Sequence, residues 1–352
     1  MDGASLSNGL SLRGITRRFG VRLAVDGVSL DAPRGRVLCL LGKSGCGKST
    51  TLRIAAGLER PDSGEVYIGG KLVEGQGVFV PPETRRVGLM FQDYALFPHL
   101  TAKANVAFGL ARLPKAERET IAEYELDRVG LLALKDAYPH TLSGGEQQRV
   151  ALARMLAPKP DVVLMDEPFS GLDAALREEV RGTTLKRLLE ADAAVVMVTH
   201  DPEEAMRAGD SVALMESGHI LQTGTPADIY RAPASRAAAA LFGGVNVFRS
   251  SVISGCVHSP FGVHPAPGMA EGAAAEIIIR PSAIQVAASG AEATLLKVRP
   301  NAGGMEIEAR LFPLTLPGEG ELPILIRAGA PAAFGLAPGA LIRLAASPGE
   351  VF

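Results

Sequence analysis

Short, uninterrupted hydrophobic segments alternate with amphipathic helical stretches over roughly the first 235 residues. The segments at 36–41, 161–165 and 193–198 have the length and the β-branched content of strands that are buried on both faces. A glycine-rich turn follows the first segment, and then a helix is expected from Lys48 to about Leu58. A further helix is expected from Ala174 onward. This alternation is typical of a parallel sheet covered by helices on both faces.

Two other regions have different patterns. The stretch from Asp93 to about Gly145 is mostly helical in its hydrophobic period and has no strong strand, so we expect a helical subdomain inserted there. After about Leu241, glycine and proline become frequent and short apolar runs recur between turn residues, which is typical of a small β-barrel or sandwich. These runs are 276–281, 293–298, 306–312, 322–328 and 340–345. The alanine-rich stretch Arg236–Leu241 is interpreted as a linker between domains 1–236 and 237–352.

The composition limits the class of protein. A chain of 352 residues suits two domains and can bury a large core. The 36 basic and 38 acidic side chains give a net charge of −2, so nothing in the overall charge indicates a nucleic-acid partner. Three cysteines without CxxC spacing form no disulfide framework, which favours a reducing cytoplasm. The N-terminus does not resemble a signal peptide, and no apolar run approaches the roughly 20 residues that span a bilayer. We therefore expect a soluble chain that reaches a membrane only by docking on another protein.

The sequence GKSGCGKS at 42–49 fits the pattern GxxxxGK[ST] and lies between a predicted strand and a predicted helix. That context is the one in which the pattern forms a phosphate-binding loop. Glycines allow backbone N–H groups to surround an anion, and the helix N-terminus adds a favourable dipole. Lys48 would reach the β- and γ-phosphates of ATP, and the Ser49 hydroxyl would bind Mg²⁺.

The sequence VVLMDEP at 162–168 places two carboxylates directly after a buried strand. Carboxyl ends of parallel strands are where open α/β sheets bind ligands. Asp166 is therefore expected to help hold Mg²⁺, and Glu167 to orient or deprotonate the attacking water. An ordinary acidic turn after a strand is the alternative.

The sequence LSGGEQQRVALAR at 142–154 places a serine and two glycines before an amphipathic helix. A second phosphate-binding helix N-terminus in one chain implies a site shared between two copies, because one phosphate-binding loop already holds one triphosphate. The alternative is a simple capping box made by Ser143 and Glu146. The capping box explains these two residues but not the pair of glycines between them.

Together these motifs resemble the nucleotide-binding subunits of ABC transporters, over roughly residues 12 to 235. The resemblance implies an α/β P-loop NTPase domain with a helical subdomain, binding ATP and Mg²⁺. It also implies that the LSGGE segment caps the γ-phosphate bound to the opposite subunit. The expected catalytic residues are Lys48, Gln92, Glu167 and His200, and the expected Mg²⁺ ligands are Ser49, Gln92 and Asp166. The expected nucleotide contacts are Phe19, Gly42, Lys43, Ser44, Gly45, Cys46, Gly47, Lys48, Ser49, Thr50, Ser143, Gly144, Gly145, Glu146 and Asp173.

Several residues in these motifs also have simpler interpretations. Phe19, at the position of the aromatic that stacks on adenine, could instead be a core residue. Cys46 could be a reactive thiol near a helix N-terminus, but a small side chain that fills the loop is the preferred reading. Cys256, His258 and His264 could suggest a metal site, yet their spacing in a segment rich in glycine and proline favours loop residues.

The second domain resembles the small all-β OB-like domain of importer ATPases. Residues 245–248 and 277–284 carry the resemblance, although Ser282 stands where the family usually has an acidic residue. The whole chain is most similar to the branch that serves ferric iron, spermidine/putrescine and related solutes, and residues 261–268 favour iron. The resemblance implies a homodimer on the cytoplasmic face of the inner membrane, bound to permease subunits and served indirectly by a solute-binding protein.

A soluble ABC ATPase that remodels DNA or ribosomes is the alternative from another class. Such proteins usually carry coiled-coil insertions, zinc modules or two tandem ATPase halves. This sequence has one ATPase unit, no heptad run, no cysteine cluster and no basic excess. We therefore expect a transporter motor without a nucleic-acid partner.

Overall fold

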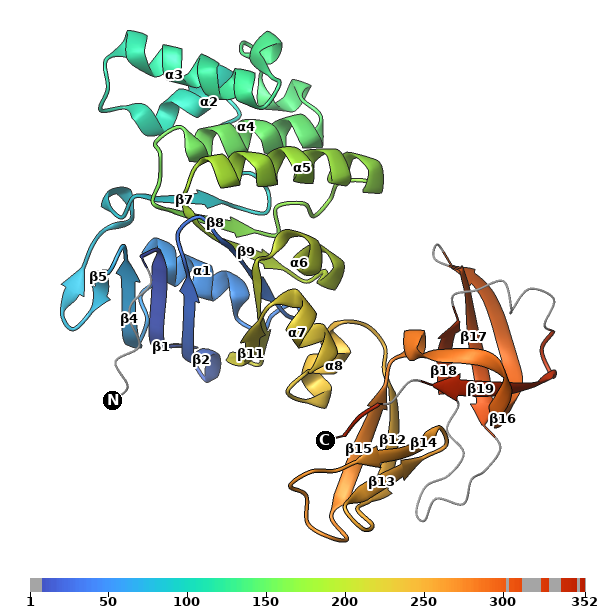
Figure 1. Ribbon diagram of the computed structural model, residues 1–352. Coiled ribbons are helices and arrows are strands. Elements are labelled where there is room, and N and C mark those ends of the chain that lie inside the picture. The colour runs from blue at the N-terminus through green and yellow to red at the C-terminus, as the bar shows by residue number, and fades with distance from the viewer. Residues whose placement is uncertain (1–7, 302–303, 312–323, 329–336, 347–348, 352) are drawn as a thin grey trace. The chain divides into compact units, whose positions relative to one another are not determined.

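A computed structural model describes residues 8–301, 304–311, 324–328, 337–346 and 349–351 (Figure 1). The chain divides into two compact units, residues 1–229 and 230–352. The expected boundary between residues 236 and 237 falls inside a helix that this division assigns to the second unit. None of the described helices is long and apolar enough to cross a membrane.

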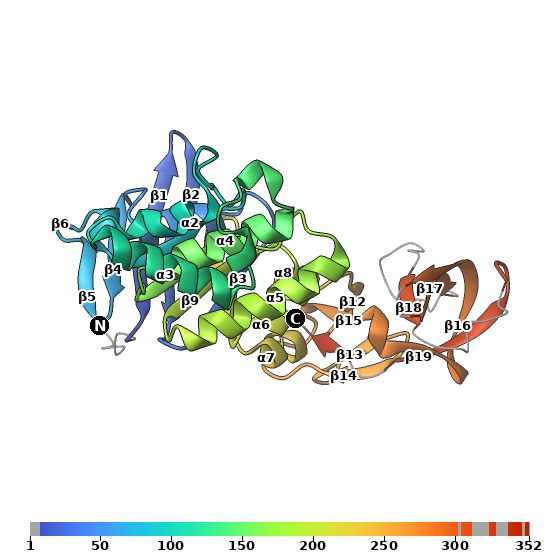
Figure 2. The same ribbon diagram turned by 90° about the horizontal axis from the view of Figure 1, so that it is seen from above.

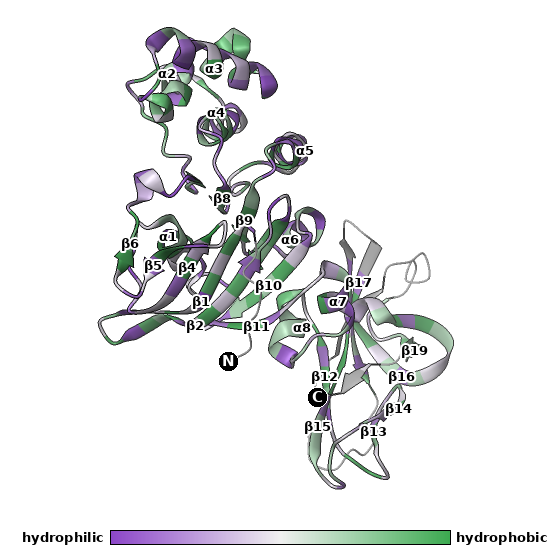
Figure 3. Cartoon of the chain, turned by 60° about the vertical axis from the view of Figure 1, so that its left-hand side comes forward, coloured by the Kyte–Doolittle hydropathy of each residue, from purple (hydrophilic) through white to green (hydrophobic). Residues whose placement is uncertain are grey.

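A six-stranded, mostly parallel sheet forms the centre of the first unit, in the order β11-β10-β3-β9-β8-β7. The strands β3, β7, β8, β9 and β10 are parallel to their neighbours, and β11 pairs antiparallel with β10. Every residue of β3 and β9 is buried, as their continuous apolar sequences predict, and Figure 3 shows the hydrophobic colouring of β9. The bounds are β3 Val37–Leu41, β7 Val87–Met90, β8 Val162–Asp166, β9 Ala194–Thr199, β10 Ser211–Glu216 and β11 His219–Gly224.

A second, antiparallel sheet in this unit was not expected from the sequence. Its order is β2-β1-β4-β5-β6. The apolar side chains Leu10, Leu12 and Ile15 of β1 are buried in the same core as those of β3 and β9. The two sheets therefore share one hydrophobic core. The bounds are β1 Leu10–Phe19, β2 Arg22–Ala32, β4 Ser63–Ile68, β5 Lys71–Gly75 and β6 Val78–Phe79.

The region from Asp93 to Gly145 contains helices and no strand among its residues, as expected. Figures 1 and 2 show α3, α4 and α5 lying side by side. The α-helices are α1 Lys48–Ala56, α2 Ala102–Ala107, α3 Lys115–Arg128, α4 Gly144–Leu156, α5 Ala174–Glu190, α6 Pro202–Ala208, α7 Pro226–Arg231 and α8 Arg236–Leu241. Short 3₁₀ turns cover Pro82–Thr84, Phe108–Leu110, Leu132–Leu134, Pro139–Thr141 and Pro281–Ala283.

The second unit is built on strands around its own core, so the predicted fold class is confirmed. Its sheets have the orders β12-β15-β20, β13-β14 and β18-β17-β16-β19. Each of the five predicted apolar runs contains a strand, although residues 312 and 322–323 lie outside the described part. The bounds are β12 Asn246–Ser251, β13 Cys256–Ser259, β14 Gly262–Pro265, β15 Ala274–Ile279, β16 Ile284–Asn301, β17 Gly304–Leu311, β18 Ile324–Ala328, β19 Leu341–Ala346 and β20 Glu350–Val351.

The stretch Arg236–Leu241 is not an open linker but the helix α8. Alanine has the highest helix propensity, and the Ser235 side chain accepts a hydrogen bond from the Ala238 N–H at 3.2 Å. Ala239 is buried, and its carbonyl accepts a hydrogen bond from Arg280. The helix is therefore packed as a structural element of the second unit.

Cys256, His258 and His264 lie on strands rather than in loops. Val257 pairs with His264 across the hairpin, so successive residues alternate in face and His258 points away from His264. Within the described residues, no group of three or more histidine, cysteine or acidic side chains is arranged to hold a metal. His264 is buried; its Nδ1 accepts from the Gly349 N–H at 3.2 Å, and burial lowers its pKa. It serves a structural role in the hairpin.

Candidate nucleotide-binding site

The side chains that the sequence predicts for the ATP site lie at the carboxyl ends of parallel strands. The phosphate-binding loop follows β3, the two acidic residues lie at the end of β8, and His200 directly follows β9. Adjacent parallel strands end at the same edge of a sheet, and β3, β9 and β8 are neighbours in this order. The structure therefore brings these groups together, as the sequence predicts for a ligand site.

The loop at 42–49 has the backbone of an anion cradle. Gly45 and Gly47 have φ angles of 79° and 114°, which bulky residues rarely adopt. Helix α1 begins at Lys48 with Gly47 as its N-cap, and neither a capping side chain nor an acidic residue occupies its first turn. Lys48 is only 4% exposed, and its Nζ donates to the carbonyls of Gly42 at 2.7 Å and Lys43 at 3.0 Å. The ammonium is thus held over the loop, and the helix N-terminus retains unused N–H donors.

We expect Gly47→Ala to lower the free energy of unfolding by about 3 kcal/mol or more. A Cβ at this position would lie 2.3 Å from the Ala24 carbonyl oxygen and would require a φ of 114°. Gly69→Ala is the matched control, because Gly69 has a φ of 55° with open space around its missing Cβ. Its loss should be about 1 kcal/mol. Urea denaturation of both variants measures the difference, and equal losses would contradict the close approach at Gly47.

The remaining loop residues differ in their exposure to solvent. Lys43, Ser44 and Gly45 are exposed, while Cys46 is buried, with its Sγ 4.0 Å from the Lys48 Nζ. Burial raises the pKa of the Cys46 thiol, so the group is held as the neutral thiol. This supports the interpretation of Cys46 as a small side chain that fills the loop. Thr50 follows Ser49 in the first turn of α1 and is partly buried.

The Ser49 hydroxyl and the Asp166 carboxylate form the candidate Mg²⁺ site. The Ser49 Oγ donates to Asp166 Oδ1 at 3.1 Å. Burial raises the pKa of Asp166; the hydrogen bond from Ser49 opposes this effect, and the adjacent Glu167 adds to it. A desolvated carboxylate beside a hydroxyl provides hard oxygen ligands that suit Mg²⁺. The donor set therefore fits the ion that the sequence implies.

Glu167 is held in a strained conformation that directs it toward His200. Its φ is 47°, in the left-handed region, and its N–H donates to the Val198 carbonyl at 3.0 Å. The Ser170 Oγ donates to the Glu167 carbonyl at 2.9 Å. The Nδ1 of His200 lies 3.0 Å from Glu167 Oε2, so the two side chains form a pair beside the phosphate-binding loop. Such strain is typical of functional positions.

Gln92 and Phe19 lie at the ends of strands. Gln92 is exposed and follows β7 after one intervening residue. Phe19 is the last residue of β1 and is 45% exposed, with the Arg17 guanidinium 4.8 Å from its ring centre. An exposed ring is not a core aromatic, so the structure removes that alternative. One face of the ring is already covered by Arg17.

The residues of the LSGGE segment form a capping box in this structure. The Ser143 N–H donates to Glu146 Oε2 at 2.8 Å, and the Glu146 N–H donates to the Ser143 Oγ at 3.4 Å. The glycine pair has a packing reason as well, because a Cβ on Gly145 would lie 3.0 Å from the Leu176 side chain of α5. The neighbouring Gly144 has more room. Asp173 caps α5 by accepting from the Leu176 N–H at 3.0 Å. These residues order the ends of two helices whose N-termini are exposed.

Sequence reasoning missed three residues that support the site. Arg22 donates to the Gly45 carbonyl of the phosphate-binding loop at 2.6 Å. Arg154 of α4 donates to the carbonyls of Tyr94 and Ala95, just after Gln92, at 2.7 Å each. The Thr199 Oγ1 accepts a hydrogen bond from the Asp201 N–H at 3.0 Å, so this contact links the residues on either side of His200. Thr199 adjoins His200, and Arg154 is the last residue of the 142–154 motif, but the contacts of both arginines join distant segments and leave no local sequence signal.

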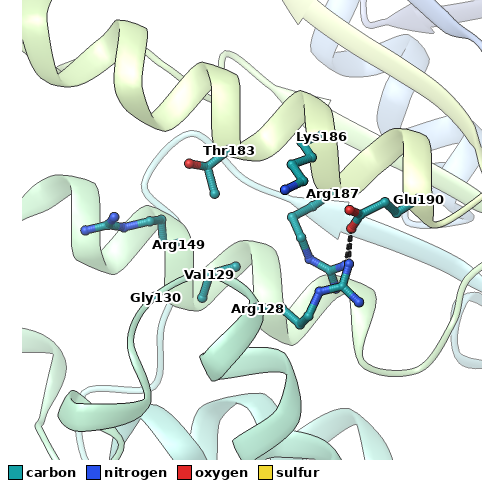
Figure 4. Close-up of a pocket in the computed structure, with 8 residues that line it drawn as sticks. All are labelled: Arg128, Val129, Gly130, Arg149, Thr183, Lys186, Arg187 and Glu190. Atoms are coloured by element: carbon teal, nitrogen blue, oxygen red, sulfur yellow. Dashed lines mark hydrogen bonds and ion pairs between the residues drawn. The ribbon is translucent and has the colours of Figure 1, made fainter.

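A separate cavity of about 320 Å³ lies among α3, α4 and α5 (Figure 4). Arg187 pairs with Glu125 and Glu190, and Glu190 also pairs with Arg128. Most of the charged side chains that line the cavity thus form ion pairs, and two of these three pairs join α3 to α5. The cavity shares no residue with the strand-end site. Its lining consists of Arg128, Val129, Gly130, Arg149, Thr183, Lys186, Arg187 and Glu190.

The fold and the site together define a P-loop ATPase of the ATP-binding cassette class. The ABC transporter family model matches residues 25–170. A sulfate/thiosulfate import ATP-binding protein of Chromobacterium violaceum is 39% identical over 99% of this chain and 93% of its own length. A Fe(3+) ions import ATP-binding protein of Escherichia coli is 40% identical over 83% of this chain and 84% of its own. The chain therefore belongs to the ABC transporter family, as an ATP-hydrolysing subunit of the importer type.

Solved structures agree with this assignment. A dimeric ATP-binding cassette in a post-hydrolysis state, bound to ADP and Pi, superimposes with a TM-score of 0.56 at 32% identity. The match covers 62% of this chain and 98% of that one. The protein cbiO1 of Clostridium perfringens, part of the ABC transporter complex cbiONQ, gives a TM-score of 0.58 at 27% identity, over 65% of this chain and 92% of that one. The extent of these matches fits the ATPase unit alone.

Proposed function

We propose that this chain hydrolyses ATP at a site shared by two copies of itself and thereby drives solute import through membrane permease subunits. The observation that supports this most directly is the convergence of Lys48, the Ser49–Asp166 pair and the Glu167–His200 pair at one sheet edge. Each group has a distinct role in phosphoryl transfer. The location proposed is peripheral, on the cytoplasmic face of the inner membrane.

The proposed roles follow from the contacts. Lys48 is already desolvated over the loop, so its ammonium stabilises negative charge on the β- and γ-phosphates. Glu167 accepts a proton from the attacking water or orients it, and His200 holds the Glu167 carboxylate in place through Nδ1. Ser49 and Asp166 would hold Mg²⁺, with Gln92 as the third expected ligand, and the ion would neutralise charge on the phosphate oxygens.

A second copy of the chain would complete the site. In the proposed dimer, the exposed N-terminus of α4, with Ser143 to Glu146, caps the γ-phosphate bound by the partner. Asp173 lies at the N-terminus of the adjacent α5 and would cross the same interface. The similarity to dimeric cassette structures supports this arrangement. Closure of the dimer on ATP, and its opening after hydrolysis, would move the permease.

The permease is proposed to dock beside residues 93–101, which directly follow Gln92. Arg154 ties the backbone of this segment to α4, whose N-terminus carries Ser143. A force on the segment would therefore reach both the Gln92 loop and the shared nucleotide site. A solute-binding protein would deliver cargo to the permease and contact this chain only indirectly. The β-rich unit, residues 237–352, is proposed to be a regulatory domain.

Ferric iron is the proposed cargo, and sulfate or thiosulfate is the second candidate. Relatives named for Fe(3+) import match at 40% identity, which supports the iron assignment from residues 261–268. The relative named for sulfate/thiosulfate import matches over 99% of this chain, including the β-rich unit, which favours the second candidate. The ATPase site is equally suited to both, because the permease and binding protein select the cargo.

Uptake measurements in a strain lacking this chain distinguish the candidates. We expect the deletion to remove most energy-dependent uptake of radioactive Fe³⁺ and to leave sulfate uptake unchanged. Restoring the wild-type chain should restore iron uptake, because transport requires the motor. Uptake of labelled spermidine serves as the comparison for the remaining solute class. Loss of sulfate uptake alone would assign the second candidate, and no change in any solute would contradict an import function.

A further inference from the structure

His200 lies in a short connection that packing alone does not fix. The strand β9 ends at Thr199 and the helix α6 begins at Pro202, so only His200 and Asp201 join them. The His200 side chain is 54% exposed, yet its Nδ1 lies 3.0 Å from Glu167 Oε2. A ring so exposed has few contacts to hold it. Its position must come from the backbone on either side.

Both neighbours of His200 are tied to α6. Thr199 is only 1% exposed; its Oγ1 donates to Glu204 Oε2 and accepts from the Asp201 N–H at 3.0 Å. Asp201 in turn caps α6, because its Oδ1 accepts from the Glu203 N–H at 2.8 Å and from the Glu204 N–H at 3.4 Å. One threonine hydroxyl thus links the end of β9, the backbone beyond His200 and a side chain of the helix.

The side chain of Glu204 is unfavourable for the stability of the fold. It is 7% exposed, and within the described part of the chain its Oε1 has no hydrogen-bonding partner. Burial raises the pKa of Glu204; the hydrogen bond from Thr199 and the charges of Arg181 and Arg177 oppose this effect, and Asp201 adds to it. A half-satisfied buried carboxyl destabilises a fold relative to an apolar side chain of similar size. Stability alone therefore does not account for a buried carboxyl at this position.

We propose that Glu204 is a positioning residue, which fixes the Thr199–Asp201 connection so that His200 stays against Glu167. This inference rests on the proposed function, since it takes the Glu167–His200 pair as part of the hydrolytic site. Glu204 acts through Thr199 and touches neither nucleotide nor water. Its removal should leave ATP bound but His200 misplaced.

Two variants of the full-length chain test the proposal. Glu204→Leu removes the acceptor for Thr199, and we expect its kcat for ATP hydrolysis to fall by about 10- to 100-fold, as for a displaced catalytic group. The KM for ATP should stay within about twofold, because the P-loop is untouched. Glu204→Gln keeps an oxygen acceptor and should retain a kcat within about threefold of wild type. Glu203→Leu is the matched control, since Glu203 is the exposed neighbour on α6 and should leave both constants unchanged.

A spectroscopic measurement separates positioning from general damage. When Glu167→Gln is the only substitution, it should shift the NMR resonances of the His200 ring, because the two side chains are in contact. In the Glu204→Leu background this response should be lost. If the response persists while kcat falls, or if kcat and KM remain those of wild type, the proposal is wrong. Thr199→Val, which removes the hydroxyl and keeps the shape, should reproduce the loss even if Glu204→Leu fails to fold.

A failure of this inference about Glu204 can be told apart from a failure of the proposed function. If His200→Ala hydrolyses ATP at the wild-type rate, the assigned role of the pair is wrong. The His200 resonances in Glu204→Leu would still report whether Glu204 positions the ring. A non-additive kcat loss in the double variant Thr199→Val/Glu204→Leu would confirm that the two residues act through one contact.

Discussion

Glu167→Gln should slow ATP hydrolysis by roughly 10²–10⁴-fold, the usual contribution of a positioned general base. The amide keeps the size of the side chain and can still accept the hydrogen bond from the Nδ1 of His200, but it cannot accept the proton of the attacking water. ATP binding should survive, because Lys48, Ser49 and Asp166 are unchanged. Loss of a carboxylate near the triphosphate also reduces like-charge repulsion. The variant should accumulate as an ATP-bound dimer in size-exclusion chromatography, with ATP and not with ADP.

Two further variants control this experiment. Ser143→Arg, combined with Glu167→Gln, should prevent the dimer by placing bulk at the exposed N-terminus of α4. Glu203→Gln changes an exposed carboxylate on α6 and should leave turnover and oligomeric state as in wild type. A Glu167→Gln chain that binds ATP but stays monomeric would reject the shared site for the isolated subunit. Dimerisation only with permease present would mean that the membrane subunits supply the missing contact energy.

Lys48→Ala should abolish detectable ATP turnover and weaken ATP binding by at least about 100-fold, equal to about 2.7 kcal/mol. The ammonium is buried at 4% exposure, so its interaction with phosphate is little screened by water. The variant also leaves the carbonyls of Gly42 and Lys43 without their donor. Titration with a fluorescent ATP analogue measures the affinity, and phosphate release measures the turnover.

Lys115→Ala is the control for Lys48→Ala, because Lys115 is 82% exposed on α3 and forms only a long ion pair with Glu119. Its affinity and turnover should equal those of wild type. Circular dichroism without nucleotide should show that both variants keep their secondary structure. If Lys48→Ala binds and hydrolyses ATP normally, the loop at 42–49 is not the phosphate-binding loop.

The local sequence was sufficient to predict the segments in which the ligand-binding motif and the backbone conformation require the same residues. The strand, glycine turn and helix around Lys48 could be predicted because each part has its own signal, namely apolar residues, glycines and a helical period. The same holds for the carboxylates after β8. Their roles were then inferred from motif order. The contact between His200 and Glu167 brings together the ends of two strands, and only the sheet topology places it.

The missed features depend on tertiary contacts. The strand β1 does alternate apolar and polar residues at Leu10, Ser11 and Leu12, but the pattern breaks at Gly14, where the register with β2 shifts. The helix α8 lies next to the change in composition, which favours a linker, whereas its packing depends on Arg280, 41 residues from Ala239. Arg154 reaches Tyr94 and Ala95 across 60 and 59 positions, a pairing that no local window contains. Each of these features depends on a contact with another segment of the chain, which the local sequence does not contain.

Helix α1 differs from its neighbours in one respect that bears on the whole protein. Side chains cap α2, α4, α5, α6 and α8, through Thr101, Ser143, Asp173, Asp201 and Ser235. The start of α1 has neither a side-chain cap nor an acidic residue in its first turn, whereas α3, which also lacks a cap, has Glu117 there. Lys48 adds positive charge at the start of α1. A bound phosphate would satisfy the free N–H groups of this helix start, so nucleotide would stabilise the folded state. By linkage, free ATP at 100 times its dissociation constant adds about 2.7 kcal/mol to the free energy of unfolding. We therefore expect the resistance of the subunit to unfolding and proteolysis to rise with the concentration of free ATP.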